Sequence, residues 1–322
     1  MQQYSSKYFS LIYFSPTLQF CNEECEWEMQ QASRREHVRT HCESLGQTAP
    51  ITAEWLRQNR KKLLRIFVSD SHQALYCSIP KVACTNWKLA IMILNGKLKL
   101  EKVQNQLQNG PIDNAAVHDK FPMTKWRLAM MSIEDIMYRL ENYKSFVFVR
   151  HPFSRTLSVY RNKFQPTGYS PDYEFAQRKY GTKIHLKYKT NSTNTSSNLT
   201  FTEFVKYLGD PTVNFYPDPE VDYPWGFKVH WTPMYDLCLP CNVKYDYIGK
   251  METYQTDTQF ILDKINATNL VDIVKGRAAH TTNSSSAHAM EEYSSQLSRE
   301  DIKGLLWRYE QDFKLFGYDM EL

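Results

Sequence analysis

The sequence predicts an α/β fold in which a parallel sheet is flanked by helices. Two short segments, 73–79 and 145–150, are almost wholly apolar and bounded by turns, as expected of strands that are covered on both faces. A third strand is predicted at 245–254. Helical patterns separate these strands along the chain. This alternation is typical of parallel strands joined by crossover helices.

The amino-terminal half supports this order element by element. Residues 1–60 are polar and mixed, and predict a stem-like or irregular segment, within which 26–43 could form a surface helix. The run 54–68 predicts a helix that leads toward the core. After the first strand, 86–96 has apolar residues at helical spacing, with Thr85 able to cap it.

The remaining elements complete one predicted catalytic domain over 61–322. A capping box and an apolar face predict a helix over 132–143, and a helix through Phe164 follows the second strand. Residues 166–225 are rich in Pro, Tyr, Asn, Ser and Thr and predict an insertion. Further helices are predicted at 199–210, 253–265 and 298–318.

The composition narrows the classes of partner. The chain has 322 residues, of which 42% are hydrophobic and 14% aromatic, so it can bury a sizeable core. Its net charge of +4 is compatible with binding anions. No stripe of lysine and arginine with interleaved aromatic residues is present, so no nucleic-acid partner is expected.

Cysteines and glycosylation sequons point to a secretory chain. Seven cysteines leave at least one unpaired, and the spacing of Cys238 and Cys241 suggests a local disulfide. The spacing of Cys238 and Cys241 also fits redox or zinc chemistry, but no second pair follows it and no His, Asp or Glu cluster has ligand spacing, so no metal is expected. The candidate glycosylation sites are Asn191, Asn194, Asn198, Asn266 and Asn283. The apolar-aromatic stretch 8–20 lacks the roughly 20 consecutive apolar residues of a membrane span.

The turn after the first strand has the features of an anion-binding site. Pro80 to Thr85 joins a strand to the amino end of a helix, where backbone N–H groups and the helix dipole favour negative charge. Lys81 adds a full positive charge, and the small Ala83 and Cys84 allow an anion to approach the backbone. The loop lacks the glycines of a Walker A motif. A turn with a solvated lysine is the plain alternative.

A second turn follows the second strand. Arg150 ends that strand, Pro152 fixes the turn, and Ser158 lies on the helix beyond. An arginine and a serine so placed can converge on one phosphate at the crevice where open parallel sheets bind ligands. A capping ion pair for Arg150 and a packed role for Ser158 are the alternatives. Two such turns indicate a ligand with two separated phosphate groups.

These two turns resemble a known family. The segments IPKVACTNWK (79–88) and FVFVRHPFSRTLSVYRNKF (146–164) are similar to the two nucleotide-binding signatures of the Golgi carbohydrate sulfotransferases. The branch with the chondroitin and dermatan 4-O-sulfotransferases and the HNK-1 sulfotransferase is the most similar, and the block at 230–253 resembles a third signature of that branch. The similarity extends over about 73–318. It implies a P-loop-kinase-like α/β sheet, in agreement with the predicted element order.

The resemblance implies PAPS (3′-phosphoadenosine 5′-phosphosulfate) as the co-substrate. The first loop would hold the 5′-phosphosulfate with Lys81 near the bridging oxygen, while Arg150 and Ser158 would hold the 3′-phosphate. The implied donor-binding residues are Pro80, Lys81, Val82, Ala83, Cys84, Thr85, Asn86, Trp87, Arg150 and Ser158.

The family reaction moves a sulfuryl group to a sugar hydroxyl, so a catalytic cation and a general base are expected. Lys81 and His118 are the candidates, His118 from its position before the helix that leads into the second strand. His230 is a candidate for acceptor binding or for structure. His151 lies in the phosphate turn, where related enzymes often carry an acid, and is not expected to be catalytic.

The implied acceptor is an anionic glycan, first of all O4 of GalNAc in chondroitin. An HNK-1-type or dermatan acceptor and an inactive glycan-binding relative stay open, whereas a P-loop kinase is disfavoured by the missing glycines. The basic run 178–189 either lines an acceptor groove or is a solvated loop. The family implies a type II membrane protein of the Golgi lumen, although no anchor is evident in the sequence.

Overall fold

The computed structural model describes residues 21–109, 117, 123–166, 172–189, 198–214, 226–276 and 283–321. Its centre is a four-stranded sheet in the order β1-β2-β3-β4. The strands are β1 (Ile66–Ser69), β2 (Ala74–Cys77), β3 (Lys144–Val149) and β4 (Tyr247–Lys250). β3 is parallel to both β2 and β4. The expected α/β fold with a mainly parallel sheet is therefore confirmed.

The strand β1 was not expected. It pairs antiparallel with β2, with Phe67 opposite Tyr76, and forms a hairpin through the turn 70–73. The helix predicted over 54–68 is wrong in its second half, since the helical turns end at Leu63. The apolar run Ile-Phe-Val that follows forms a β-strand, because these β-branched and aromatic side chains pack well on a pleated sheet.

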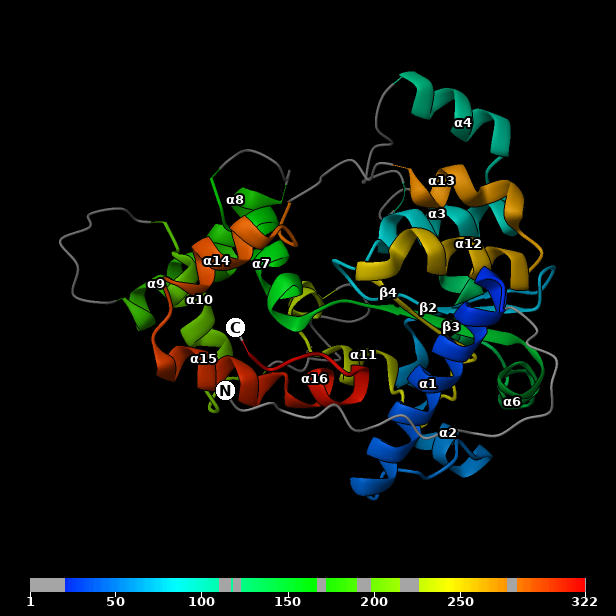
Figure 1. Cartoon of the computed structure of the whole chain (residues 1–322), viewed down its shortest axis with the longest axis horizontal. Coiled ribbons are helices and arrows are strands. Elements are labelled where there is room, and N and C mark those ends of the chain that lie inside the picture. Colours follow the sequence, from blue (N-terminus) through cyan, green and yellow to red (C-terminus); the bar gives the residue numbers. More distant parts are fainter. Residues whose placement is uncertain are drawn as a thin grey trace, which may run out of the picture.

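Helices cover both faces of the sheet (Figure 1). The face with α3, α12 and α13 lies opposite the face with α11 and α16, and α1 passes along the edge that β4 forms. The helices of the part that contains the sheet are α1 (Glu23–Ser44), α2 (Ala53–Asn59), α3 (Cys84–Leu94), α4 (Leu100–Asn109), α6 (Ile133–Asn142), α11 (Met234–Cys238), α12 (Tyr254–Lys264), α13 (Val271–Lys275) and α16 (Glu310–Phe316).

A second apolar cluster lies beside the sheet, built around α7 (Pro152–Lys163) (Figure 1). The other helices of this part are α8 (Tyr173–Ala176), the π-helical turn η4 (Gln177–Gly181), α9 (Thr182–Tyr188), α10 (Phe201–Gly209), α14 (Ala287–Ser294) and α15 (Arg299–Arg308). The predicted closing helix is two helices, because the chain bends at Tyr309. The short 3-10 helices are η1 (Arg60–Leu63), η2 (Met123–Trp126), η3 (Leu128–Met130), η5 (Phe227–His230), η6 (Met251–Thr253) and η7 (Thr268–Leu270).

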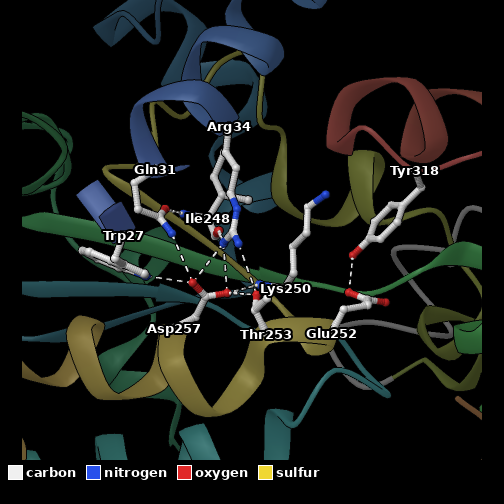
Figure 2. Close-up of polar contacts among 9 residues, drawn as sticks. All are labelled: Trp27, Gln31, Arg34, Ile248, Lys250, Glu252, Thr253, Asp257 and Tyr318. Atoms are coloured by element: carbon white, nitrogen blue, oxygen red, sulfur yellow. Dashed lines mark hydrogen bonds and ion pairs between the residues drawn. The ribbon is translucent and has the colours of Figure 1, made fainter. Parts of the chain in front are cut away.

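Helix α1 covers the outer edge of β4, within the segment expected to be stem-like or irregular. Gln31 Oε1 accepts a hydrogen bond from the Ile248 N–H at 2.8 Å, and Arg34 Nη1 donates to the Ile248 carbonyl at 2.7 Å (Figure 2). Arg35 donates to the Asp246 carbonyl in the same way. Side chains of α1 thus satisfy edge groups that another strand would otherwise pair. The division of domains at residue 60 stays a prediction.

The disulfide expected between Cys238 and Cys241 is wrong. Cys238 pairs with Cys77 at the end of β2, and Cys241 pairs with Cys42 on α1. Leu239 between them has a left-handed backbone, with φ of 49°, and the turn directs the two cysteines to different parts of the core. Within the described residues, Cys21 pairs with Cys25 and Cys84 is a free thiol.

Candidate active site

The first anion turn lies where β2 ends and α3 begins. Lys81 and Ala83 both have left-handed backbones, with φ of 69° and 49°, which non-glycine residues seldom adopt outside strained or functional turns. α3 begins at Cys84, after Ala83, and no side chain caps its amino end. The cap predicted for Thr85 is therefore wrong, because the helix begins one residue earlier. The backbone N–H groups at the amino end of α3 are therefore available to bind an anion.

Arg150 links the second turn to the first. It lies at the end of β3, is 8% exposed, and donates from Nη1 to the carbonyl of Lys81 at 3.1 Å. Its Nη2 donates to the hydroxyls of Ser284 and Ser285 at 2.8 and 2.6 Å. Burial lowers the pKa of Arg150 to about 10. The two turns that the sequence singled out are thus one continuous site.

Ser154 completes this serine cluster. Its hydroxyl accepts from Arg150 Nε at 3.0 Å, donates to the Ser284 carbonyl at 3.1 Å, and lies 2.8 Å from the Ser285 hydroxyl. Ser158, the predicted ligand, is buried one helical turn further along α7. Sequence reasoning missed Ser154, although its place four residues after Arg150 is a detectable signal. No local signal marks Ser284 and Ser285, which lie far along the chain.

Several cations share the site. Burial, reinforced by the neighbouring Lys163 and Arg150, lowers the pKa of Lys81 from 10.5 to about 7. Lys163, near the end of α7, is buried and forms an ion pair with Asp172. Like charges at short range disfavour the protonated state of Lys81, and a bound anion would relieve that repulsion. The arrangement is therefore suited to a ligand with several negative charges.

Arg155 joins the first turn to the segment that carries His230. It is buried on α7 and donates to the carbonyls of Pro80, Val229 and Thr232, at 3.1, 3.3 and 2.8 Å. Burial lowers its pKa. Because its guanidinium is held by backbone acceptors on both segments, Arg155 fixes their relative position. Sequence reasoning did not identify this residue.

His230 lies beside the cations of the site. Its Nδ1 is 2.8 Å from the Phe227 carbonyl, which can only accept, so we assign the ring proton to Nδ1 and the lone pair to Nε2. Burial, followed by the effects of Lys163 and Lys81, lowers the pKa of His230 well below its usual value. The ring is therefore neutral at neutral pH. His118, the predicted base, lies outside the described residues.

The ring of His151 packs against aromatic side chains, and the expectation that it is not catalytic stays a prediction. Its ring meets Phe313 and Tyr318 edge-on, each at 5.4 Å between centroids. Its backbone N–H donates to Glu252 at the start of α7. Burial lowers the pKa of the ring, which fits its apolar surroundings.

Some predicted donor-binding residues direct their side chains away from the turn. Asn86 donates to the carbonyls of Val274 and Gly276, and Trp87 packs between aromatic rings of the sheet. Val82 is also buried. Any donor contact from these residues would therefore come from their backbone, and their donor-binding role stays a prediction.

The sequons differ in their surroundings. Asn266 and Asn283 are exposed, whereas Asn198 is partly buried and accepts from the Tyr173 hydroxyl at 3.4 Å. Asn191 and Asn194 lie outside the described residues. Glycosylation at all five stays a prediction. Within the part of the chain that the structure describes, no helix combines the length and apolar character of a membrane span, and no cluster of three potential metal ligands occurs.

Comparison with known proteins identifies relatives over the whole site. A model described as the sulfotransferase family matches residues 64–319. Carbohydrate sulfotransferase 14 of Danio rerio is 31% identical over 301 residues, which cover 92% of this chain and 74% of that protein. Carbohydrate sulfotransferase 10 of Xenopus laevis is 35% identical over 257 residues, covering 79% and 67%. Carbohydrate sulfotransferase 11 of Mus musculus is 32% identical over 263 residues, covering 80% and 68%. No solved structure gives a significant match.

Proposed function

Because the chain belongs to the sulfotransferase family, we propose that it is a carbohydrate sulfotransferase that moves a sulfuryl group from PAPS to O4 of GalNAc in chondroitin. The general activity is that of its named relatives. The donor-site residues, the base and the acceptor sugar are our assignments.

One observation carries the donor assignment. Arg150 contacts the backbone of Lys81 and the hydroxyls of Ser284 and Ser285, so the two anion turns form a single cationic site. A ligand with phosphate groups at both ends, as in PAPS, fits two adjoining anion sites. The uncapped amino end of α3 and Lys81 would hold the phosphosulfate, and Arg150, Ser158 and neighbouring serines the 3′-phosphate.

In the transfer step, charge develops on the bridging oxygen as the bond to sulfur breaks. Lys81 is the group we assign to stabilise that charge, since protonated amines near a leaving oxygen lower such barriers. PAPS supplies the sulfuryl group. Burial and neighbouring cations lower the pKa of Lys81 to about 7 in the free protein, and a bound anion would raise it again, so Lys81 is charged when it is needed.

The acceptor hydroxyl must lose its proton. We keep His118 as the first candidate base and His230 as the second. His230 is favoured by a specific arrangement: its ring is neutral, its Nδ1 faces the Phe227 carbonyl, and it lies close enough to Lys81 for their charges to interact. A neutral imidazole with an available Nε2 can accept a proton.

We propose that the protein resides in the Golgi lumen as a membrane-associated glycoprotein. Disulfides are typical of oxidising compartments, and this chain contains three within its described residues. The sequons at Asn266 and Asn283 are exposed, as glycosylation requires.

The test is transfer of radiolabelled sulfate from PAPS to a panel of desulfated glycans by wild type, Lys81→Ala, His118→Ala and His230→Ala. We expect incorporation at O4 of GalNAc in chondroitin, with loss in Lys81→Ala and in the variant that lacks the base. Transfer only to dermatan or to a terminal glucuronate would replace the acceptor assignment. PAP binding by wild type without transfer to any glycan would favour an inactive glycan-binding relative.

A further inference from the structure

An aromatic wall extends from the reacting groups to the surface of the protein. His230 and Phe227 have ring centroids 5.1 Å apart, and Phe227 contacts Phe175 of α8 at 5.5 Å. Tyr180 stacks on Phe227 at 5.4 Å with an interplanar angle of 16°. We refer to Phe175, Tyr180 and Phe227 as the aromatic wall. A single ring, Phe227, thus separates the proposed chemistry from Phe175.

Lys163 ties this wall to the cationic site. Its Nζ lies 5.4 Å from the centroid of the Phe227 ring. Burial and then the charge of Lys163 lower the pKa values of both Lys81 and His230, so the Lys163 ammonium is near both of these groups. The wall therefore begins at the proposed transfer site.

The outer end of the wall is exposed. Phe175 is 42% exposed, one of few large apolar side chains so open among the described residues. An exposed ring offers an apolar face on which a sugar ring can stack, and aromatic residues contribute large contact area at binding sites. The adjacent turn η4 is a π-helix, a form often found at functional sites.

A groove of about 560 Å³ opens on α8, η4 and α9, and Phe175 lies three residues before Arg178 on this helical stretch, so the two side chains are neighbours along it. Arg178 and Lys183 line the groove together with Tyr173 and Glu174. Asn198 lines it as well, so acceptor binding here requires that this sequon carries no glycan. Both basic side chains are exposed. Over 172–189 the chain has five lysine or arginine residues against two acidic ones, so the surroundings are positive. Arginine and lysine at a groove with aromatic neighbours can bind the carboxylate of a sugar acid.

We propose that the aromatic wall and this groove form an acceptor subsite for a uronate-bearing glycan, in which Phe175 stacks on a sugar ring and Arg178 and Lys183 bind a uronate carboxylate. This inference rests on the proposed function, because it places the sugars that flank the reacting one. It assigns acceptor affinity to α8, η4 and α9, which are separate from the donor-binding turns.

The test measures glycan binding without turnover. Wild-type protein saturated with PAP is titrated with a desulfated chondroitin hexasaccharide, and compared with Phe175→Ala and with the double variant Arg178→Ala/Lys183→Ala. We expect each to weaken glycan binding roughly tenfold or more, as for loss of one buried contact or of a charged hydrogen bond. PAP affinity should stay unchanged, since none of these residues belongs to the donor site.

Matched control variants remove an aromatic ring or two positive charges from surfaces away from the groove. Tyr138→Ala deletes an exposed ring on α6, and Lys99→Ala/Lys102→Ala deletes two exposed positive charges at α4. Neither should change glycan affinity. A hexasaccharide whose uronate carboxyl groups have been reduced adds a chemical control. Wild type should bind this reduced glycan as weakly as Arg178→Ala/Lys183→Ala binds the native glycan. The double variant should bind the native and the reduced glycan with equal affinity.

Three results would overturn the proposal. These are equal glycan affinity in wild type and both groove variants, equal affinity of wild type for native and carboxyl-reduced glycan, and no glycan binding by PAP-saturated wild type. Failure of the proposed function is separate, because it would appear as loss of PAP binding or of sulfate transfer in wild type.

Discussion

Arg34 on α1 donates through Nη1 to both carboxylate oxygens of Asp257 on α12, at 3.0 and 2.9 Å (Figure 2). The same nitrogen donates to the Ile248 carbonyl of β4. The Asp257 side chain is 1% exposed and that of Arg34 13% exposed. A segment that precedes the family match is thereby attached to the edge of the central sheet.

Asp257 is predicted to be essential for stability. Besides Arg34, it accepts hydrogen bonds from the Trp27 indole and from the Lys250 backbone N–H. Asp257→Ala leaves these buried donors without an acceptor, and we expect a loss of about 3–5 kcal/mol in the free energy of unfolding. Urea denaturation followed by circular dichroism measures it. Asp263→Ala, an exposed aspartate on the same helix, is the matched control and should be nearly neutral. Equal midpoints for the two variants would contradict the role assigned to Asp257.

The strands β2 and β3 could be predicted because each is a short apolar run with a helix after it, and β4 lies within the strand predicted at 245–254. β1 could not, since three apolar residues soon after a basic helical segment look like a continuation of that helix. The packing of α1 against the edge of β4 could not be predicted from the sequence either. Its contacts to β4 come from polar side chains such as Gln31 and Arg34, which in a sequence look like an exposed helix face.

Some residues of the candidate site could likewise be predicted from the sequence, and others could not. Lys81 and Arg150 were identifiable because each follows a strand directly, and parallel strands bring their carboxyl ends to one edge. Ser284 and Arg155 were not identifiable, because their contacts depend on how distant segments pack. The disulfide partners of Cys238 and Cys241 were missed for the same reason: spacing suggested a local pair, and the fold directs them apart.

The disulfides provide a second prediction. Peptide mapping of protein digested without reduction should recover Cys77 with Cys238 and Cys42 with Cys241, and Cys84 should be alkylated without reduction. Cys241→Ser should lower the free energy of unfolding by about 2–5 kcal/mol, because it releases a long covalent loop. Cys84→Ser is the control and should change stability little. Recovery of a peptide linking Cys238 to Cys241 would refute the pairing.

A third prediction concerns the guanidinium of Arg150. Arg150→Lys keeps the positive charge but loses the planar fork that reaches the Lys81 carbonyl and Ser284 together. We expect the Kd for PAP, measured by calorimetry, to rise about tenfold or more. Arg161→Lys on α7, whose guanidinium lies 6.0 Å from the Tyr293 ring, is the control and should bind PAP normally. Equal PAP affinity in the two variants would exclude Arg150 from the donor site.

The fourth prediction concerns the charge on Lys81. Burial and the neighbouring Lys163 and Arg150 set its pKa to about 7 in the free protein. A bound anion raises that pKa, so at pH 8 a mostly neutral amine becomes protonated on binding, whereas at pH 6 it is protonated in both states. PAP binding should therefore take up about one proton at pH 8. At pH 6 Lys81 takes up almost none, and the phosphates of PAP, with a second pKa of about 6, release protons instead. Affinity should fall as pH rises above about 7.

Titration calorimetry in two buffers of different ionisation enthalpy, repeated at both pH values, measures this uptake. Lys81→Arg is the control that separates Lys81 from other groups, because arginine stays protonated throughout and should bind PAP with little uptake at pH 8. His230→Gln distinguishes the nearby imidazole, whose pKa is lowered by burial and by Lys163, and uptake should persist in that variant. If wild type shows the same binding heat in both buffers at pH 8, Lys81 does not change its protonation state, and it would have to be charged already in the free site.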